Sequence, residues 1–152
     1  MSHPVQQEAP TTAALEDRIL DVFKAPCLSG LATVTGDGKP WVRYVMTEAS
    51  DDMTFRCSSF TAGRKVPQIE KNPEVHLTCG IIQPTEKGPY LQIEGRAEFT
   101  TDRDARHSFW SDRLSLVFEG PDDPNYGVVV IRAYRIELWV VGEEPEVWER
   151  GS

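Results

Sequence analysis

The chain has 152 residues, 39% of them hydrophobic, and its 16 basic and 24 acidic side chains give a net charge of −8. Length and composition are typical of one globular domain. The acidic excess disfavours nucleic acid or an anionic membrane as a partner of the whole surface.

The N-terminal segment differs from the rest of the chain. Residues 1–12 are polar, contain two prolines and lack the apolar core of a signal peptide. We therefore predict a disordered tail over 1–12 and a single domain over 13–152. The sequence has no apolar run near the ~20 residues of a membrane span. Its three widely spaced cysteines form no CxxC pair, which favours a reducing, cytoplasmic compartment.

Apolar periodicity and turn residues predict nine elements. In chain order they are a helix from Leu15 that ends at Pro26, strands over 28–34, 41–47 and 53–58, a short helix from Arg64-Lys65 to Asn72, strands over 75–82 and 90–99, a helix over 102–118, and a last strand over 126–141.

Two features indicate how the strands are joined. Gly36 to Lys39 separates the first two strands and has the composition of a hairpin turn. Gly95 interrupts the alternation of the fifth strand, which indicates a bulge or a barrel corner. Six strands joined mostly by tight turns predict a mainly β fold, a small six-stranded antiparallel barrel with peripheral helices.

Arg64 and Lys65 stand where the short helix is predicted to begin. The first turn of a helix carries free N–H groups and the positive end of the dipole, so a cation there costs a few tenths to about 1 kcal/mol. A nearby phosphate would remove this conflict, because the amides and both side chains would point at it. The alternative is a solvated helix start that binds nothing.

Arg43 adds a third cation on the second strand, on the same face as Val45 and Thr47. It is either a rim arginine whose head reaches water or a carboxylate, or part of the same anion site. The small donors Ser58 and Ser59 end the third strand. They could bond a phosphate or a ring edge, or they could simply form a loop.

Other chemistries have less support in the sequence. Cys57 lacks a Cys-His signature that would make it a nucleophile. The three histidines show no metal-ligand spacing, so we predict no metal site. GxGxxG and GxxxxGK[ST] motifs are absent, which argues against Rossmann and P-loop nucleotide sites. We identify no catalytic acid or base.

Three segments carry a resemblance to a known family. They are Arg43-Tyr44-Val45-Met46, the stretch from Met53 through Cys57-Ser58 and Arg64-Lys65 to Val75, and Ile93 to Glu98. Together they resemble the FMN-binding split barrels related to pyridoxamine 5'-phosphate oxidase, in particular the general stress protein branch. The resemblance implies a six-stranded antiparallel split barrel, FMN as cofactor and a homodimer with the flavin at the subunit interface.

The resemblance also implies roles for individual residues. Arg43, Arg64 and Lys65 would hold the FMN phosphate. Tyr44, Val45 and Met46 would form the strand beside the flavin, and Cys57 and Ser58 the strand end that contacts the cofactor. Trp139 would reach the flavin of the partner subunit.

The chain departs from the oxidase at positions that bind substrate. Glu48 stands where the oxidase has a lysine for the substrate phosphate, and an acidic segment, Glu143 to Glu149, replaces its Arg-Leu-His element. We therefore expect a flavin-dependent oxidoreductase of unknown substrate. A flavin-binding stress or electron-transfer module without its own substrate is the alternative, and pyridoxamine 5'-phosphate oxidase itself is less favoured. FAD, heme or a deazaflavin could replace FMN in such a barrel.

Overall fold

The computed structural model describes residues 12–151, so residues 1–11 of the predicted tail lie outside the described residues. The elements are α1 (Thr12–Val22), β1 (Cys27–Val34), β2 (Pro40–Ser50), β3 (Thr54–Phe60), α2 (Lys65–Lys71), β4 (Glu74–Cys79), β5 (Tyr90–Thr100), α3 (Arg103–Phe109), the 3-10 helix η1 (Asp112–Leu116), β6 (Tyr126–Trp139) and β7 (Glu146–Glu149).

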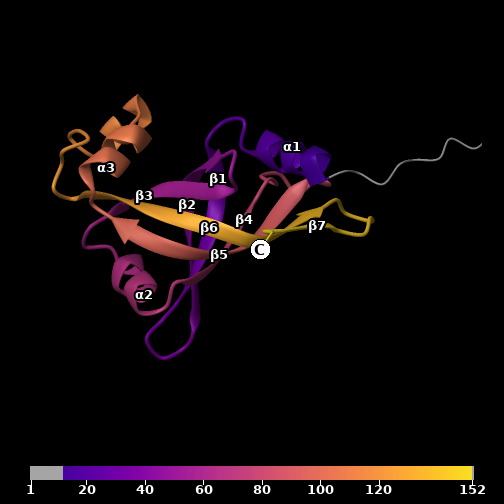
Figure 1. Ribbon diagram of the computed structural model, residues 1–152, viewed down its shortest axis with the longest axis horizontal. Coiled ribbons are helices and arrows are strands. Elements are labelled where there is room, and N and C mark those ends of the chain that lie inside the picture. Colours follow the sequence, from indigo (N-terminus) through magenta and orange to yellow (C-terminus); the bar gives the residue numbers. More distant parts are fainter. Residues whose placement is uncertain (1–11, 152) are drawn as a thin grey trace, which may run out of the picture.

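Six strands close into an antiparallel barrel in the order β3-β2-β1-β4-β5-β6, and the pairing of β3 with β6 completes the ring (Figure 1). The long strand β6 pairs with two different strands along one of its edges. Its first half, 126–132, pairs with β3, and positions 135–138 pair with β7 outside the ring. The predicted six-stranded antiparallel barrel is confirmed. We did not predict β7, because its four residues lie in an acidic stretch without clear alternation.

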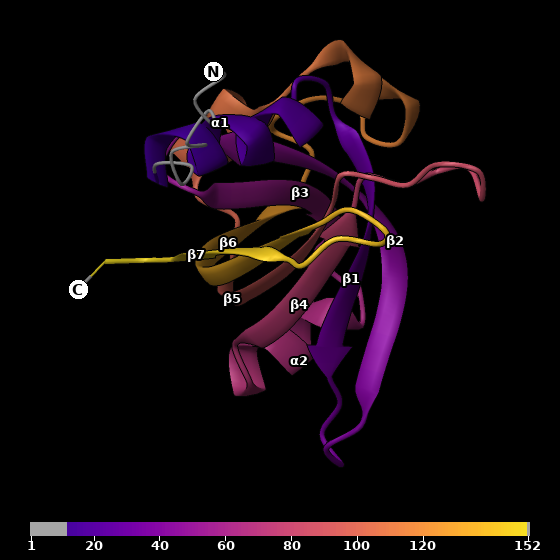
Figure 2. The ribbon, with the colours of Figure 1, turned by 90° about the vertical axis from the view of Figure 1, so that its right-hand side faces the viewer.

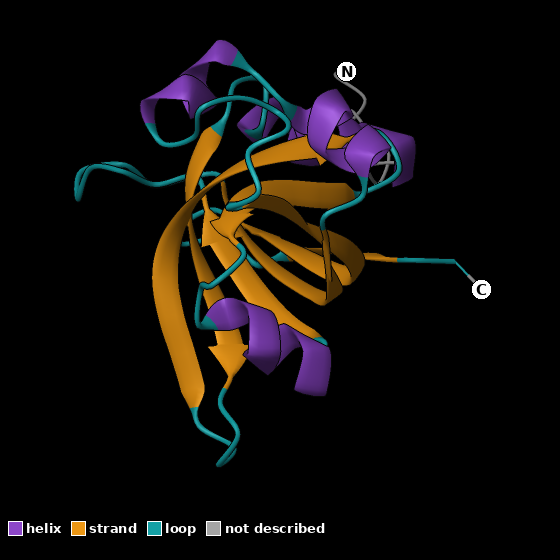
Figure 3. Ribbon diagram, turned by 90° about the vertical axis from the view of Figure 1, so that its left-hand side faces the viewer, coloured by secondary structure: helices purple, strands orange, loops and turns teal. Residues whose placement is uncertain are grey.

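The barrel interior follows from the alternation of side chains along each strand. One residue in two points inward, and Leu31, Phe55, Leu77, Ile93 and Ile131 are fully buried there. Each such side chain contributes roughly 1.5–3 kcal/mol by leaving water. In Figures 2 and 3, α1 and α3 lie at one end of the barrel and α2 lies at the other, beside the β1–β2 turn.

The predicted helix over 102–118 is wrong in its second half. α3 ends at Phe109, Trp110 has an extended backbone, and η1 follows after Ser111. The break allows both Phe109 and Leu114 to enter a second small core with Phe118 and Tyr126. Tertiary packing therefore overrides the loose helical spacing that we read from the sequence.

Gly95 occupies the bulge that the sequence predicted. The β5–β6 register shifts between Glu94 and Gly95. A Cβ at Gly95 would lie 2.8 Å from Cγ2 of Ile131, so a side chain has no room there. No helix within residues 12–151 combines the length and the apolar character that crossing a membrane requires.

Candidate functional site

Arg43 is held by neutral groups. It lies on β2 opposite Leu31 of β1, and its Nη1 donates to Oγ1 of Thr33 at 2.6 Å and to the Trp41 carbonyl at 3.1 Å. Its Nη2 donates to Oε1 of Gln68, on α2, at 3.2 Å. These bonds fix the guanidinium between the β1–β2 hairpin and α2, and none of them neutralises its charge.

Lys65 begins α2, and its Nζ donates to Oγ of Ser59, at the end of β3, at 3.0 Å. Gly63 lies close to both groups. A Cβ at Gly63 would lie 3.1 Å from the Phe60 carbonyl oxygen, 3.2 Å from Oγ of Ser59 and 3.7 Å from Nζ of Lys65. A side chain at this position would therefore crowd the loop between β3 and α2 beside the ammonium group and the hydroxyl group.

Three cations of this region have no acidic partner within the described residues. None of the ion pairs formed by residues 12–151 includes Arg43, Arg64 or Lys65. Burial lowers the pKa of Arg43 and of Lys65, and the charge of Arg43 lowers the pKa of Lys65 further. Burial raises the pKa of the nearby Cys57 thiol to about 12, so this thiol is neutral and balances neither cation. Two half-buried cations thus lie within electrostatic reach of each other without a counter-charge.

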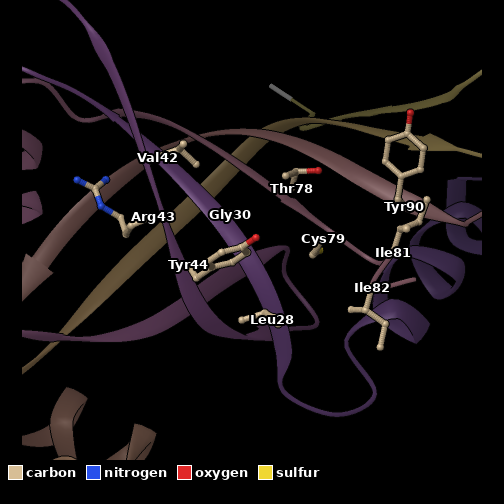
Figure 4. A pocket seen from close by; sticks show the side chains of 10 residues that line it. All are labelled: Leu28, Gly30, Val42, Arg43, Tyr44, Thr78, Cys79, Ile81, Ile82 and Tyr90. Atoms are coloured by element: carbon tan, nitrogen blue, oxygen red, sulfur yellow. The ribbon is translucent and has the colours of Figure 1, made fainter. Parts of the chain in front are cut away.

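Two surface hollows meet at Tyr44. The Lys65 hollow, about 390 Å³, is lined by Tyr44, Val45, Met46, Ser58, Ser59, Phe60 and Lys65, and by the segment from Arg113 to Phe118. The Tyr90 hollow, about 560 Å³, is lined by residues of β1, β2 and β4 and by Ile81, Ile82 and Tyr90. Figure 4 shows Tyr44 and Leu28 on one side of the Tyr90 hollow and Ile82 and Tyr90 on the other. Both hollows are largely apolar, and Arg43 lines the Tyr90 hollow whereas Lys65 lines the other.

The predicted site residues fall into three groups. Six of them line the hollows: Arg43 lines the Tyr90 hollow, Val45, Met46, Ser58 and Lys65 line the Lys65 hollow, and Tyr44 lines both. Cys57 is fully buried in the barrel core and lines neither hollow. Arg64 is exposed and precedes α2 without capping it, and α2 has only seven residues. The positive charge of this site therefore comes mainly from side chains and only weakly from a helix dipole.

Trp139 lies away from Lys65, at the end of β6. Its ring stacks on Tyr90 with centroids 6.4 Å apart and planes 14° apart, and its Nε1 donates to Oε1 of Glu137 at 2.8 Å. Trp139 does not line the Lys65 hollow of its own chain. Its position beside the Tyr90 hollow is compatible with a contact to a second protomer.

Sequence reasoning missed three residues of this region. Gln68 and Thr33 accept hydrogen bonds from Arg43 and orient it. Oγ1 of Thr33 also donates to Oε1 of Gln68 at 2.5 Å. Arg113 reaches the Lys65 hollow from η1 and pairs with Glu48 at 3.5 Å. Its buried Nε has no hydrogen-bond partner among residues 12–151. No sequence motif marks these residues, because they meet only when α2 and η1 fold against the barrel.

Comparisons with known proteins support one family. The family described as pyridoxamine 5'-phosphate oxidase matches residues 15–140. General stress protein 26 of Bacillus subtilis is 32% identical over 133 residues, which cover 88% of this chain and 94% of the relative. A pyridoxine/pyridoxamine 5'-phosphate oxidase of Rubrobacter xylanophilus is 28% identical, in an alignment that covers 79% of this chain and 68% of the relative.

A solved structure agrees with the sequence comparisons. The crystal structure of general stress protein 26 from Bacillus anthracis superimposes with a TM-score of 0.76 at 26% identity, and covers 90% of this chain and 98% of its own. Because the family match extends through every strand of the barrel, the chain belongs to the pyridoxamine 5'-phosphate oxidase family.

Proposed function

We propose that this protein is an FMN-binding flavoprotein in which Arg43 and Lys65 neutralise the FMN phosphate and Arg64 adds charge at the rim. The unpaired, half-buried cations Arg43 and Lys65 carry this proposal. A phosphate brings about two negative charges and several acceptor oxygens, so it can satisfy both cations at once. The hydroxyl of Ser59, which accepts from Lys65 and lines the same hollow, adds a polar group beside it.

The remainder of the Lys65 hollow suits a flat, mostly apolar ring. Tyr44, Met46, Phe60 and Leu116 line it, and its volume lies within the roughly 300–1,000 Å³ of ligand pockets. One ligand that is anionic at one end and aromatic at the other would use both halves of the hollow. FMN has this form, whereas inorganic phosphate would leave the apolar half uncovered.

Bound FMN would supply hydride or electron transfer at its ring. The chain would contribute the phosphate-binding cations, the position of the ring and an apolar wall that excludes water. The ion pair between Arg113 and Glu48 at the edge of the hollow would offer both charges to a small redox partner. We therefore favour a flavin-dependent oxidoreductase whose substrate is not a simple phosphate ester, because the Arg113–Glu48 pair has no net positive charge to receive a second phosphate.

We also propose that two copies associate through the face that contains the Tyr90 hollow. Val42, Tyr44 and Ile82 expose 67%, 81% and 68% of their surface there, and contiguous apolar surface of this kind often marks an interface. In such a dimer, Trp139 of one protomer would approach the flavin of the other. Val42→Asp should therefore convert the dimer to a monomer in light scattering, whereas Val147→Asp, an exposed apolar site on β7, should not.

The absorption spectrum of the purified protein is the primary test of the cofactor. We expect flavin bands, and tighter binding of FMN than of riboflavin when the apoprotein is titrated with each. A protein that binds neither flavin, or that shows a heme Soret band instead, would overturn the proposal.

A second experiment separates the oxidoreductase from a flavin-binding module without a substrate. The flavin-loaded protein is mixed with NADH or NADPH without oxygen, and bleaching of the flavin bands is followed, then their return on addition of an acceptor. Catalytic cycling supports the enzyme. A flavin that no nicotinamide reduces supports the module.

A further inference from the structure

We propose that Cys27 and Cys79 form a redox-active thiol pair that a hydroperoxide converts to an intramolecular disulfide. The site lies at the end of the barrel where β1 begins and β4 ends, and Cys79 also lines the Tyr90 hollow. It is independent of the proposed cofactor.

The register of the two strands brings the thiols together. β1 and β4 are antiparallel neighbours, and Ser29 lies directly opposite Cys79. Cys27 lies two residues before Ser29, so it is on the same face of the sheet and diagonal to Cys79. Each thiol shifts the pKa of the other, which places the two side chains close together, and the Cys27 thiol also contacts the Leu28 carbonyl at 3.8 Å. Both belong to the edge of the barrel core.

The two sulfur atoms have different environments. Cys27 is partly exposed, whereas Cys79 is only 6% exposed. Hydrogen bonds from Cys79, from the backbone of Gly80 and from Ser29 lower the pKa of Cys27 to about 7 against the effect of burial. The hydrogen bond to Cys27 and burial raise the pKa of Cys79. Cys27 is thus the accessible thiolate, and Cys79 is its protonated neighbour.

The chemistry needs two balanced steps. The Cys27 thiolate attacks one oxygen of hydrogen peroxide, the O–O bond breaks, and water leaves after protonation, which gives a sulfenic acid on Cys27. The Cys79 sulfur then attacks the Cys27 sulfur, the S–O bond breaks, and a second water leaves with the Cys79 proton. Two thiols are oxidised, one peroxide is reduced to two waters, and a thiol reductant reverses the change.

Both cysteines lie at the end of the β1–β4 ladder. The ladder ends at the Ser29–Cys79 pair, while Cys79 stays paired with Leu91 of β5. Gly80 follows with φ of +116°, and residues 80–89 run without helix or strand. A disulfide requires roughly 4.4–6.8 Å between Cα atoms, so formation of the bond draws the start of β1 toward Cys79. The bond would tie the start of β1 to the end of β4 beside the Tyr90 hollow.

Peptide mapping of the full chain tests the proposal. The protein is treated with hydrogen peroxide, the remaining thiols are alkylated after unfolding, and the digest is read by mass spectrometry without reduction. We expect one cross-linked peptide pair that contains Cys27 and Cys79 and that disappears on reduction. Cys57 serves as an internal control, because it is fully buried with a raised pKa and should be alkylated in full.

Two variants assign the roles. Cys79→Ser should leave Cys27 as a sulfenic acid that dimedone traps, and Cys27→Ser should slow oxidation of Cys79 about tenfold or more. Circular dichroism checks that each variant is folded. If a variant is not folded, the peptide map of the oxidised wild-type protein alone decides whether the Cys27–Cys79 disulfide forms. Equal oxidation of all three cysteines, or over-oxidation of Cys27 without a disulfide in the wild type, would overturn the proposal.

Discussion

Two arginines of the same barrel differ in how their charge is balanced. Arg135, on β6, donates to Glu137 and lies 3.8 Å from Glu149 and 4.0 Å from Glu94. Arg43, on β2, meets only hydroxyl, carbonyl and amide oxygens. In a chain with 24 acidic side chains, carboxylates are abundant, so the lack of an ion pair to Arg43 or Lys65 within residues 12–151 is a local property of the fold. Carboxylates surround Arg135, whereas Arg43 forms no ion pair within residues 12–151.

Removal of Lys65 should have the largest effect. Lys65→Ala should weaken FMN binding about 10- to 100-fold, because a hydrogen bond to a charged group contributes about 1.5–3 kcal/mol. Riboflavin, which has no phosphate, should lose little. Lys71→Ala, at the other end of α2, is the matched control and should bind both flavins as the wild type does. Isothermal titration of the three apoproteins with each flavin measures all six affinities, and an equal loss for both flavins in Lys65→Ala would place Lys65 elsewhere than at the phosphate.

Mixed dimers test whether Lys65 of one protomer and Trp139 of the other serve the same flavin site. Trp139→Ala should weaken flavin binding about 3- to 10-fold through loss of an aromatic contact. If each site combines Lys65 of one protomer with Trp139 of the other, a mixture of Lys65→Ala and Trp139→Ala chains regains intact sites. Random pairing predicts about a quarter of the sites at wild-type affinity. A mixture that shows only the two mutant affinities would indicate that both residues serve the same protomer.

Substitutions near Lys65 and near Arg135 should change the stability of the flavin-free protein in opposite directions. Lys65→Met removes a desolvated cation without a counter-charge, so we expect the free energy of unfolding to rise by about 0.5 kcal/mol. Glu137→Gln removes a partner of Arg135 and Trp139, so the free energy of unfolding should fall in this variant. Urea unfolding in low and high salt measures both. A loss of stability in both variants would show that Lys65 is already balanced in the free protein.

The smallest expected effect is the change that the Arg135–Glu137 pair makes to the pH dependence of stability. Hydrogen bonds from Arg135 and then Trp139 lower the pKa of Glu137 below its ordinary value of 4.5. The folded state therefore binds this proton more weakly than the unfolded state, and ionised Glu137 contributes its full stability above pH 4.5. This contribution is lost as the pH falls through the lowered value. Arg135→Ala should flatten the pH dependence of the urea midpoint in this window, and Arg103→Ala, on the exposed start of α3, should not.

The barrel was predictable because each strand carries its own signal. The hairpin turn at Gly36 to Lys39 separates β1 and β2 as predicted, and the register shift falls at Gly95. The break at Trp110 was not predictable, because the spacing of Phe109 and Leu114 fits a helix until both must enter one cluster. The short strand β7 lacks a pattern of its own and forms only because β6 offers a free edge.

For the candidate site, the sequence supplied the cations and the family pattern that connects Arg43 with Arg64 and Lys65. It determined the alternation that closes a barrel, because burial of apolar side chains acts through the local period of the chain. Only the tertiary structure decided which charges remain unpaired. Carboxylates that are close in sequence, such as Glu70, form no ion pair with these cations, whereas Gln68 and Ser59 reach them. Charge balance depends on distance in space and on burial, and neither is set until α2 and η1 fold against the barrel.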